Sequence, residues 1–152
     1  MTIWKKRLEL SEVQRFCADT LVSHLAIEFT EVGEDYLCAK MPVDARTVQP
    51  MGLLHGGASV TLAESLGSMA GSLCVDLGTQ HCVGLEINAN HVRAVRSGWV
   101  YGRARPLHNL PPVAALVCEI TAVVARRLLA TSRPSSLLRR DSASFAQLGP
   151  VS

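Results

Sequence analysis

The sequence predicts an α+β domain in which an antiparallel β-sheet wraps around one long central helix. A helical stretch from Ala58 to about Val75 carries apolar residues on most of its circumference, which is typical of a buried helix. Segments with strand-like patterns lie before it, within 27–41, and after it, at Cys82–Val92 and Gly98–Arg105. Strands on both sides of one buried helix favour a sheet that packs over that helix.

Length and composition are those of one packed domain. The chain has 152 residues, of which 48% are hydrophobic and 18% charged, a balance typical of globular proteins. Its formal net charge of +2 is too small to indicate a nucleic-acid partner. No run near the start is apolar enough for a signal peptide, and none elsewhere reaches the roughly 20 apolar residues of a membrane span. We therefore expect a cytoplasmic protein.

The cysteines do not indicate a disulfide framework or a zinc site. There are five of them, widely spaced and without a CxxC pair, and the histidines show no HxxxH spacing. We expect reduced, mostly buried cysteines and no bound metal.

The N-terminal part is expected to form a short helix and a β-hairpin. Ser11–Val22 has the spacing of an amphipathic helix, with Ser11 as its N-cap. Ile27–Val32 alternates with period two, Gly33–Asp35 has the composition of a turn, and Tyr36–Met41 is again extended. A polar link then leads to the central helix.

Two glycines precede that helix. Gly56 and Gly57 allow close approach of a ligand and leave N–H groups without partners where the helix begins. The helix dipole favours negative charge there, so the N–H of Gly56 can stabilise the oxyanion that forms when a carbonyl group is attacked. A Gly-Gly pair before a helix is more often only a turn, and His55 taken alone is more often structural than catalytic.

Glu64 lies inside the otherwise apolar helix. Burying an unpartnered carboxylate is costly, so we expect a raised pKa, although a buried glutamate is more often salt-bridged. Gly56 lies eight residues earlier, which is about 12 Å along one helix. One chain cannot bring both groups to one carbonyl, whereas two copies with antiparallel helices would form two equivalent composite sites. We therefore expect that activity requires a dimer.

An ordered set of motifs runs from Ile3 to about His108. It comprises Met41-Pro42-Val43-Asp44, Gln49-Pro50, Gly52-Leu53-Leu54-His55-Gly56-Gly57-Ala58-Ser59, Leu62-Ala63-Glu64-Ser65 and Gly84–Arg93. With these motifs the chain resembles the hotdog-fold acyl-CoA thioesterases, in the branch of 4-hydroxybenzoyl-CoA and phenylacetate-type thioesterases that carries the acid on the central helix. Within that branch it is most similar to the thioesterases that act on 1,4-dihydroxy-2-naphthoyl-CoA.

The resemblance implies a role for each matching residue. Glu64 is the nucleophile or the general base on water, and Gly56 polarises the carbonyl through its N–H. Gln49 and His55 assist at the thioester, while Ser68, one helical turn beyond the acid, helps to place water. Contacts to the substrate or to its CoA portion are implied for His91, Arg93 and His108. For His91, a polar residue that closes a strand is an equally open interpretation.

The resemblance also implies an activity and an assembly. The reaction is hydrolysis of aromatic acyl-CoA thioesters to the free acid and CoA, by a homotetramer built as a dimer of dimers. No metal and no separate cofactor is implied, because CoA arrives as part of the substrate. The open alternatives are a thioesterase for medium-chain aliphatic acyl-CoA or acyl-carrier-protein, a hotdog dehydratase or hydratase, and a non-catalytic acyl-CoA binding protein.

After His108 the chain departs from the family pattern. Val117–Ile120 and Arg127–Arg133 still match the last two strands of the family, but the residues from Pro134 onward match nothing in it. We therefore predict a single hotdog domain over 1–133 and an atypical, flexible C-terminal tail over 134–152. One hypothesis is an altered reading frame near the end of the gene, which resequencing would test.

Overall fold

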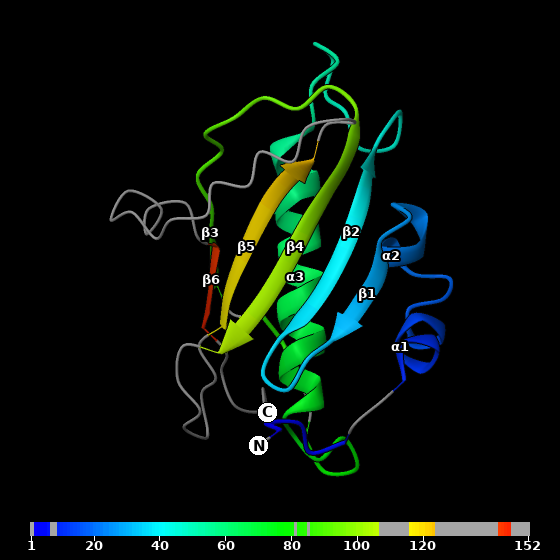
Figure 1. Cartoon of the computed structure of the whole chain (residues 1–152), viewed down its shortest axis with the longest axis vertical. Coiled ribbons are helices and arrows are strands. Elements are labelled where there is room, and N and C mark those ends of the chain that lie inside the picture. Colours follow the sequence, from blue (N-terminus) through cyan, green and yellow to red (C-terminus); the bar gives the residue numbers. More distant parts are fainter. Residues whose placement is uncertain are drawn as a thin grey trace.

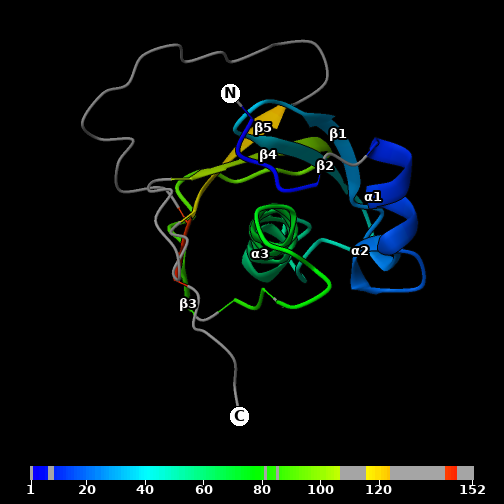
Figure 2. The same cartoon turned by 90° about the horizontal axis from the view of Figure 1, so that it is seen from below.

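The computed structural model shows a sheet curved around one long helix (Figures 1 and 2). It describes residues 2–6, 9–80, 82–84 and 86–106, and the backbone of two further strands at 116–123 and 143–146. Figure 2 looks along the central helix α3 (Gly56–Leu73), with strands on two sides of it and the short helices α1 (Leu10–Phe16) and α2 (Leu21–His24) at one edge. The predicted α+β class with a wrapped central helix is confirmed.

Within the described residues, six strands form one sheet. In chain order they are β1 (Glu28–Val32), β2 (Leu37–Val43), β3 (Glu86–Asn88), β4 (Gly98–Pro106), β5 (Leu116–Val123) and β6 (Ala143–Ala146). Their spatial order is β1-β2-β4-β5-β6-β3, and every neighbouring pair is antiparallel. The strand that follows α3 in the chain, β3, therefore forms the edge opposite β1.

The core lies between α3 and the inner face of the sheet. Every second residue of β2 is buried, which is the pattern of a strand with one face toward a core. Leu62 and Leu66 of α3 are fully buried beneath the sheet, and burial of each side chain stabilises the fold by about 1.5–3 kcal/mol. The helix approaches β4 closely at Gly102, where a Cβ atom would lie 2.4 Å from Cδ1 of Leu66.

The N-terminal helix differs from the prediction, because two short helices replace one continuous helix. Asp19 adopts a positive φ of 56°, which interrupts a right-handed helix, and Thr20 then caps α2 by accepting a backbone hydrogen bond of 3.3 Å. The predicted N-cap Ser11 is also wrong. Glu9 is the N-cap of α1, and its N–H donates to the carboxylate of Glu12 at 2.9 Å.

The hairpin of β1 and β2 and the central helix are confirmed, with α3 beginning at Gly56. Among the described residues of the extended segment predicted over Cys82–Val92, only β3 pairs as a strand. The reason is that the segment packs along α3 on either side of β3, where Gly84 lies against Glu64 and His91 lies against Gly56.

The C-terminal predictions are described only in part. Strand β5 contains the predicted Val117–Ile120 and extends beyond it at both ends. Within the predicted tail, the structure describes strand β6, which pairs with β5 and β3. The expected strand Arg127–Arg133 and the domain boundary at residue 133 lie outside the described residues.

Candidate active site

A hydrogen-bonded loop fixes the start of α3. Thr47 is buried, and its hydroxyl donates to the carbonyl of Pro42 at 2.8 Å. The carbonyl of Thr47 accepts from the N–H of His55 at 2.8 Å, and the carbonyl of Val95 accepts from the N–H of Leu54 at 2.7 Å. Anchored from both sides, the chain enters the helix in one defined direction.

His55 is the N-cap of α3. Its Nδ1 accepts a hydrogen bond from the backbone N–H of Gly57 at 2.8 Å. Because an Nδ1 that accepts is unprotonated, the neutral imidazole carries its proton on Nε2 and can donate from that atom. The side chain is exposed, so this donor is accessible to a bound molecule.

Gly56 begins the helix next to this cap. The first N–H groups of a helix have no partner within it and form the positive end of its dipole. The imidazole of His91 lies directly against Gly56, since a Cβ built on Gly56 would lie 2.7 Å from Nε2 of His91. The structure thus brings His55, Gly56 and His91 together, and we call them the helix-start group.

Glu64 lies in the middle of α3, half-buried among mostly apolar residues. Burial raises the pKa of Glu64, and the hydrogen bond that the Ser68 hydroxyl donates to its Oε1 (3.1 Å) partly opposes this shift. The carboxylate also lies against the backbone of Gly84. A carboxylate with a raised pKa is well suited to accept a proton near neutral pH. We call Glu64, Ser68 and Gly84 the acid group.

The two groups lie on one helix but cannot meet at one atom within a chain. Gly56 and Glu64 both belong to α3, and the helical rise separates them by about 12 Å. The helix-start group can bind a developing negative charge, whereas the acid group can activate water or attack an electrophile.

Comparison with known proteins places the chain in a family. Residues 51–109 match the model of the thioesterase superfamily. A 1,4-dihydroxy-2-naphthoyl-CoA hydrolase of Escherichia coli K12 is 56% identical over 106 residues, which cover 70% of this chain and 77% of that protein. The proofreading thioesterase EntH of Cronobacter turicensis is also 56% identical over 106 residues, again covering 70% of this chain and 77% of the relative. The chain belongs to the thioesterase superfamily.

Two solved thioesterase structures share the fold. A variant of thioesterase PA1618 from Pseudomonas aeruginosa superposes with a TM-score of 0.83 and 38% identity, over 99% of this chain and 100% of that one. Thioesterase HI1161 from Haemophilus influenzae superposes with a TM-score of 0.79 and 41% identity, over 97% of this chain and 94% of that one. The predicted hotdog fold is confirmed, and the chain is a thioester hydrolase.

The remaining predicted site residues of this thioesterase are placed differently. The side chain of Gln49 is engaged in its own loop, where Oε1 accepts from the N–H of Met51. The backbone N–H of Gln49 donates to the carbonyl of Leu53 at 2.7 Å. Arg93 is exposed, and His108 lies outside the described residues.

The sequence alone gives Gly84 no role beyond its place in a motif. The sequence does contain one indication of such a role, the glycine in the apolar run Val83-Gly84-Leu85. A glycine in an extended apolar run often marks a position that another group approaches closely. The structure identifies that group as the carboxylate of Glu64.

Among the residues that the structure describes, no group of three or more His, Cys, Asp or Glu side chains could hold a metal ion. None of the helices in this part of the thioesterase is long and apolar enough to cross a membrane.

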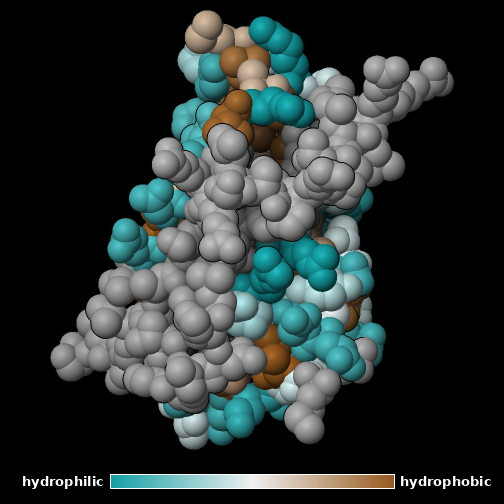
Figure 3. Space-filling model, turned by 60° about the vertical axis from the view of Figure 1, so that its left-hand side comes forward, coloured by the Kyte–Doolittle hydropathy of each residue, from teal (hydrophilic) through white to brown (hydrophobic). Residues whose placement is uncertain are grey.

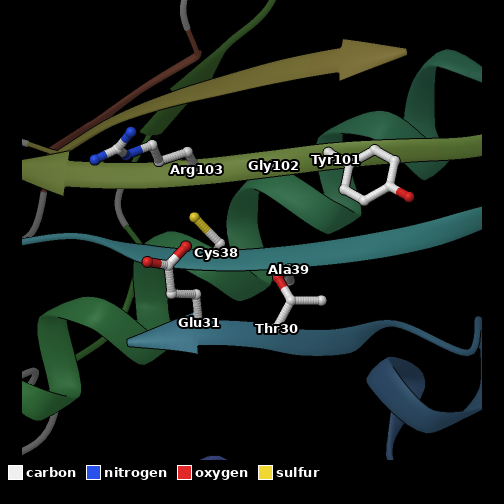
Figure 4. Close-up of a pocket in the computed structure, with 7 residues that line it drawn as sticks. All are labelled: Thr30, Glu31, Cys38, Ala39, Tyr101, Gly102 and Arg103. Carbon is white, nitrogen blue, oxygen red and sulfur yellow. The ribbon is translucent and has the colours of Figure 1, made fainter. Parts of the chain in front are cut away.

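A separate hollow lies on the outer face of the sheet (Figure 4). It is lined by Thr30, Glu31, Cys38, Ala39, Tyr101, Gly102 and Arg103. Beside it, the Tyr36 hydroxyl donates to the Glu31 carboxylate, and the Arg103 guanidinium stacks on the Tyr36 ring at 3.6 Å. In Figure 4 α3 lies behind the sheet, so this hollow is distinct from both groups on the helix.

Proposed function

We propose that this thioesterase hydrolyses aromatic acyl-CoA thioesters to the free acid and CoA, with Glu64 as the catalytic carboxylate. The observation that carries the proposal is a half-buried Glu64 on the apolar helix α3, held by Ser68 and with its pKa raised by burial. Such a perturbed carboxylate costs folding free energy unless it is paired, and perturbed groups of this kind cluster at active sites.

In the proposed mechanism, the helix-start group of one chain binds the carbonyl oxygen. The N–H of Gly56 and the Nε2–H of His55 donate to this oxygen as negative charge develops on it. The Glu64 of the second chain either takes a proton from water as the water attacks the carbonyl carbon, or attacks this carbon itself to form an anhydride that water opens. In the first route the C–S bond then breaks as the protonated Glu64 returns its proton to the sulfur, and CoA leaves as the thiol. In the second route the C–S bond breaks as the anhydride forms, CoA leaves as the thiolate, and this thiolate takes up a proton released when water opens the anhydride. Ser68 aligns the carboxylate.

The separation of the two groups supports a dimer as the smallest active unit. Two copies with antiparallel α3 helices would place the Glu64 of each opposite the Gly56 of the other. The two groups would then meet across the dimer, although they lie about 12 Å apart along the helix of one chain. We propose that two such dimers associate into a tetramer.

Apolar residues near the helix start favour an acyl group with a large apolar surface. Met51 and Val92 are 77% and 72% exposed, and Figure 3 shows hydrophobic residues gathered at the end of the molecule where α3 begins. The relative from Escherichia coli is named for an aromatic thioester, a naphthoyl-CoA. Medium-chain aliphatic acyl-CoA would be a second substrate class, because apolar pockets discriminate only modestly between acyl groups.

Four further polar residues complete the proposed site. Gln49 would assist at the thioester once its amide turns out of its own loop. Contacts to the substrate or to its CoA portion are proposed for His91, Arg93 and His108. No separate cofactor is proposed.

The test is hydrolysis of a panel of aromatic and aliphatic acyl-CoA thioesters, followed by the released thiol. We expect fastest turnover of aromatic substrates by the wild type and none by Glu64→Ala. The control is Glu28→Ala, which removes an exposed carboxylate from β1. Full activity of Glu64→Ala would refute the catalytic role of Glu64. A folded wild type that cleaves no thioester would favour the alternative of a non-catalytic acyl-CoA binding protein.

A further inference from the structure

Glu64 and Gly84 are in a contact that only glycine permits. A Cβ atom built on Gly84 would lie 2.2 Å from Oε1 of Glu64, 2.9 Å from Cδ and 3.1 Å from Oε2. These are the three nearest atoms to that position, and real Cβ atoms essentially never approach another heavy atom closer than 3.0 Å. The space that a side chain at 84 would occupy is therefore filled by the carboxylate.

The backbone conformation does not explain the glycine. The positive-φ glycines among the described residues are Gly52 and Gly98, and Gly84 is not one of them. An alanine can therefore adopt the backbone conformation of Gly84, and the three atoms nearest to its methyl group would all belong to Glu64. The reason for a glycine at this position is therefore the space that it leaves for the side chain of Glu64.

We propose that Gly84 is a positioning residue for Glu64, because its missing side chain leaves the space in which the carboxylate is held between the Ser68 hydroxyl and the backbone at 84. The inference rests on the proposed function, in which Glu64 is the catalytic group. The segment between α3 and β3 would thereby hold the carboxylate of Glu64 in place from outside the helix.

The size of the effect follows from the distances. To reach ordinary van der Waals contact of 3.4–4 Å from a methyl group at 84, Oε1 must move by more than 1 Å from its place at 2.2 Å. The carboxylate is at the end of a flexible side chain, so the fold accommodates this movement and the displacement falls on the acid. A misplacement of about 1 Å in an active site costs about 10²-fold in rate.

The experiment is a double-mutant cycle of Gly84→Ala and Glu64→Asp, with kcat and KM measured on one acyl-CoA substrate. Glu64→Asp withdraws the carboxylate by about 1.5 Å, one C–C bond, and so vacates the space that the methyl group needs. The control is Gly78→Ala, in the exposed loop after α3, where a Cβ would lie 3.3 Å from the nearest atom, Oδ1 of Asp76.

We expect Gly84→Ala to lower kcat by about 10²-fold with KM nearly unchanged, because the lost alignment affects the reacting step more than binding. In the Glu64→Asp background the same substitution should cost less than about tenfold, since the two changes are coupled. Gly78→Ala should behave like the wild type. Equal losses from Gly84→Ala in both backgrounds, or a kcat within about twofold of wild type, would overturn the inference.

Folding is monitored by circular dichroism and by the oligomeric state. If Gly84→Ala fails to fold, refolding in the Glu64→Asp background supports the contact with Glu64, and failure there too overturns it. Glu64→Gln separates the two proposals. If that variant keeps wild-type activity, the proposed function fails, whereas an inactive Glu64→Gln beside a normal Gly84→Ala overturns only the role of Gly84.

Discussion

The start and the middle of α3 carry complementary chemistry and are built by different physical means. At the start, His55 is exposed, and its position is set by hydrogen bonds to Gly57 and Thr47, which are near it in the sequence. In the middle, Glu64 is half-buried, and its position also depends on Gly84, from a distant part of the chain. The backbone donors at the start are thus set mostly by residues near them in the sequence, with the Val95 carbonyl as a distant anchor for Leu54, whereas the carboxylate with a raised pKa depends on burial by the surrounding fold.

The largest effect is expected from removing the charge in the middle of the helix. Glu64→Gln keeps the size of the side chain and its contact with Ser68 but cannot accept a proton or act as a nucleophile. We expect kcat to fall by about 10²–10⁴-fold, the usual contribution of a general base, with KM little changed. Steady-state kinetics on an aromatic acyl-CoA measures this. A loss of less than about tenfold would mean that another group activates water.

The second prediction concerns the separation of the two groups. Gly56→Ala places a methyl group against His91 and disturbs the helix start, whereas Glu64→Gln disables the acid group. A mixed dimer of these two variants contains one site with both groups intact. Unfolding and refolding an equal mixture should therefore restore about a quarter of the wild-type activity, since half of the dimers are mixed and each has one working site.

The control for this experiment is each variant refolded alone, which should stay inactive. A mixture as inactive as its components would show that both groups of a site come from the same chain. That result would contradict the distance of about 12 Å between them along α3.

The sequence predicts a contact in the site when the two residues lie close together along the chain, and it misses a contact between distant residues. Gly56, Glu64 and Ser68 are predictable because helical spacing alone relates them. The contact of Glu64 with Gly84 is not, because it depends on how the chain returns along α3. The break at Asp19 is missed for a related reason, since a helical apolar pattern continues through a residue whose φ is positive.

The third prediction concerns the hydrogen bond that tunes the acid. Burial raises the pKa of Glu64, and the bond from Ser68 lowers it because it stabilises the ionised carboxylate. Ser68→Ala removes only the lowering effect, so the pKa of Glu64 should rise further. In the proposed mechanism the ionised form of Glu64 is the active one, so the acid limb of the pH–rate profile should move to higher pH.

At a pH below this limb, the loss in rate from Ser68→Ala should be up to about tenfold, as expected for one hydrogen bond. Ser72→Ala is the matched control, because the Ser72 hydroxyl bonds a backbone carbonyl of the same helix (2.8 Å) and not the acid. An acid limb that moves to lower pH in Ser68→Ala would contradict the assigned sign.

The smallest effect on stability is expected at the helix start, where His55 caps α3 and, in the proposed mechanism, also donates to the carbonyl oxygen. As the N-cap it accepts from the N–H of Gly57, and loss of such a cap costs about 0.5–2 kcal/mol of stability. His55→Ala should show this loss in denaturant unfolding at fixed protein concentration, and His55→Asn should recover most of it, because asparagine is a good N-cap. Neither variant retains the Nε2–H donor, so kcat should be below the wild-type value in both. Recovery of both stability and kcat in His55→Asn would mean that the imidazole only caps the helix, and the carbonyl would then depend on the backbone of Gly56 alone.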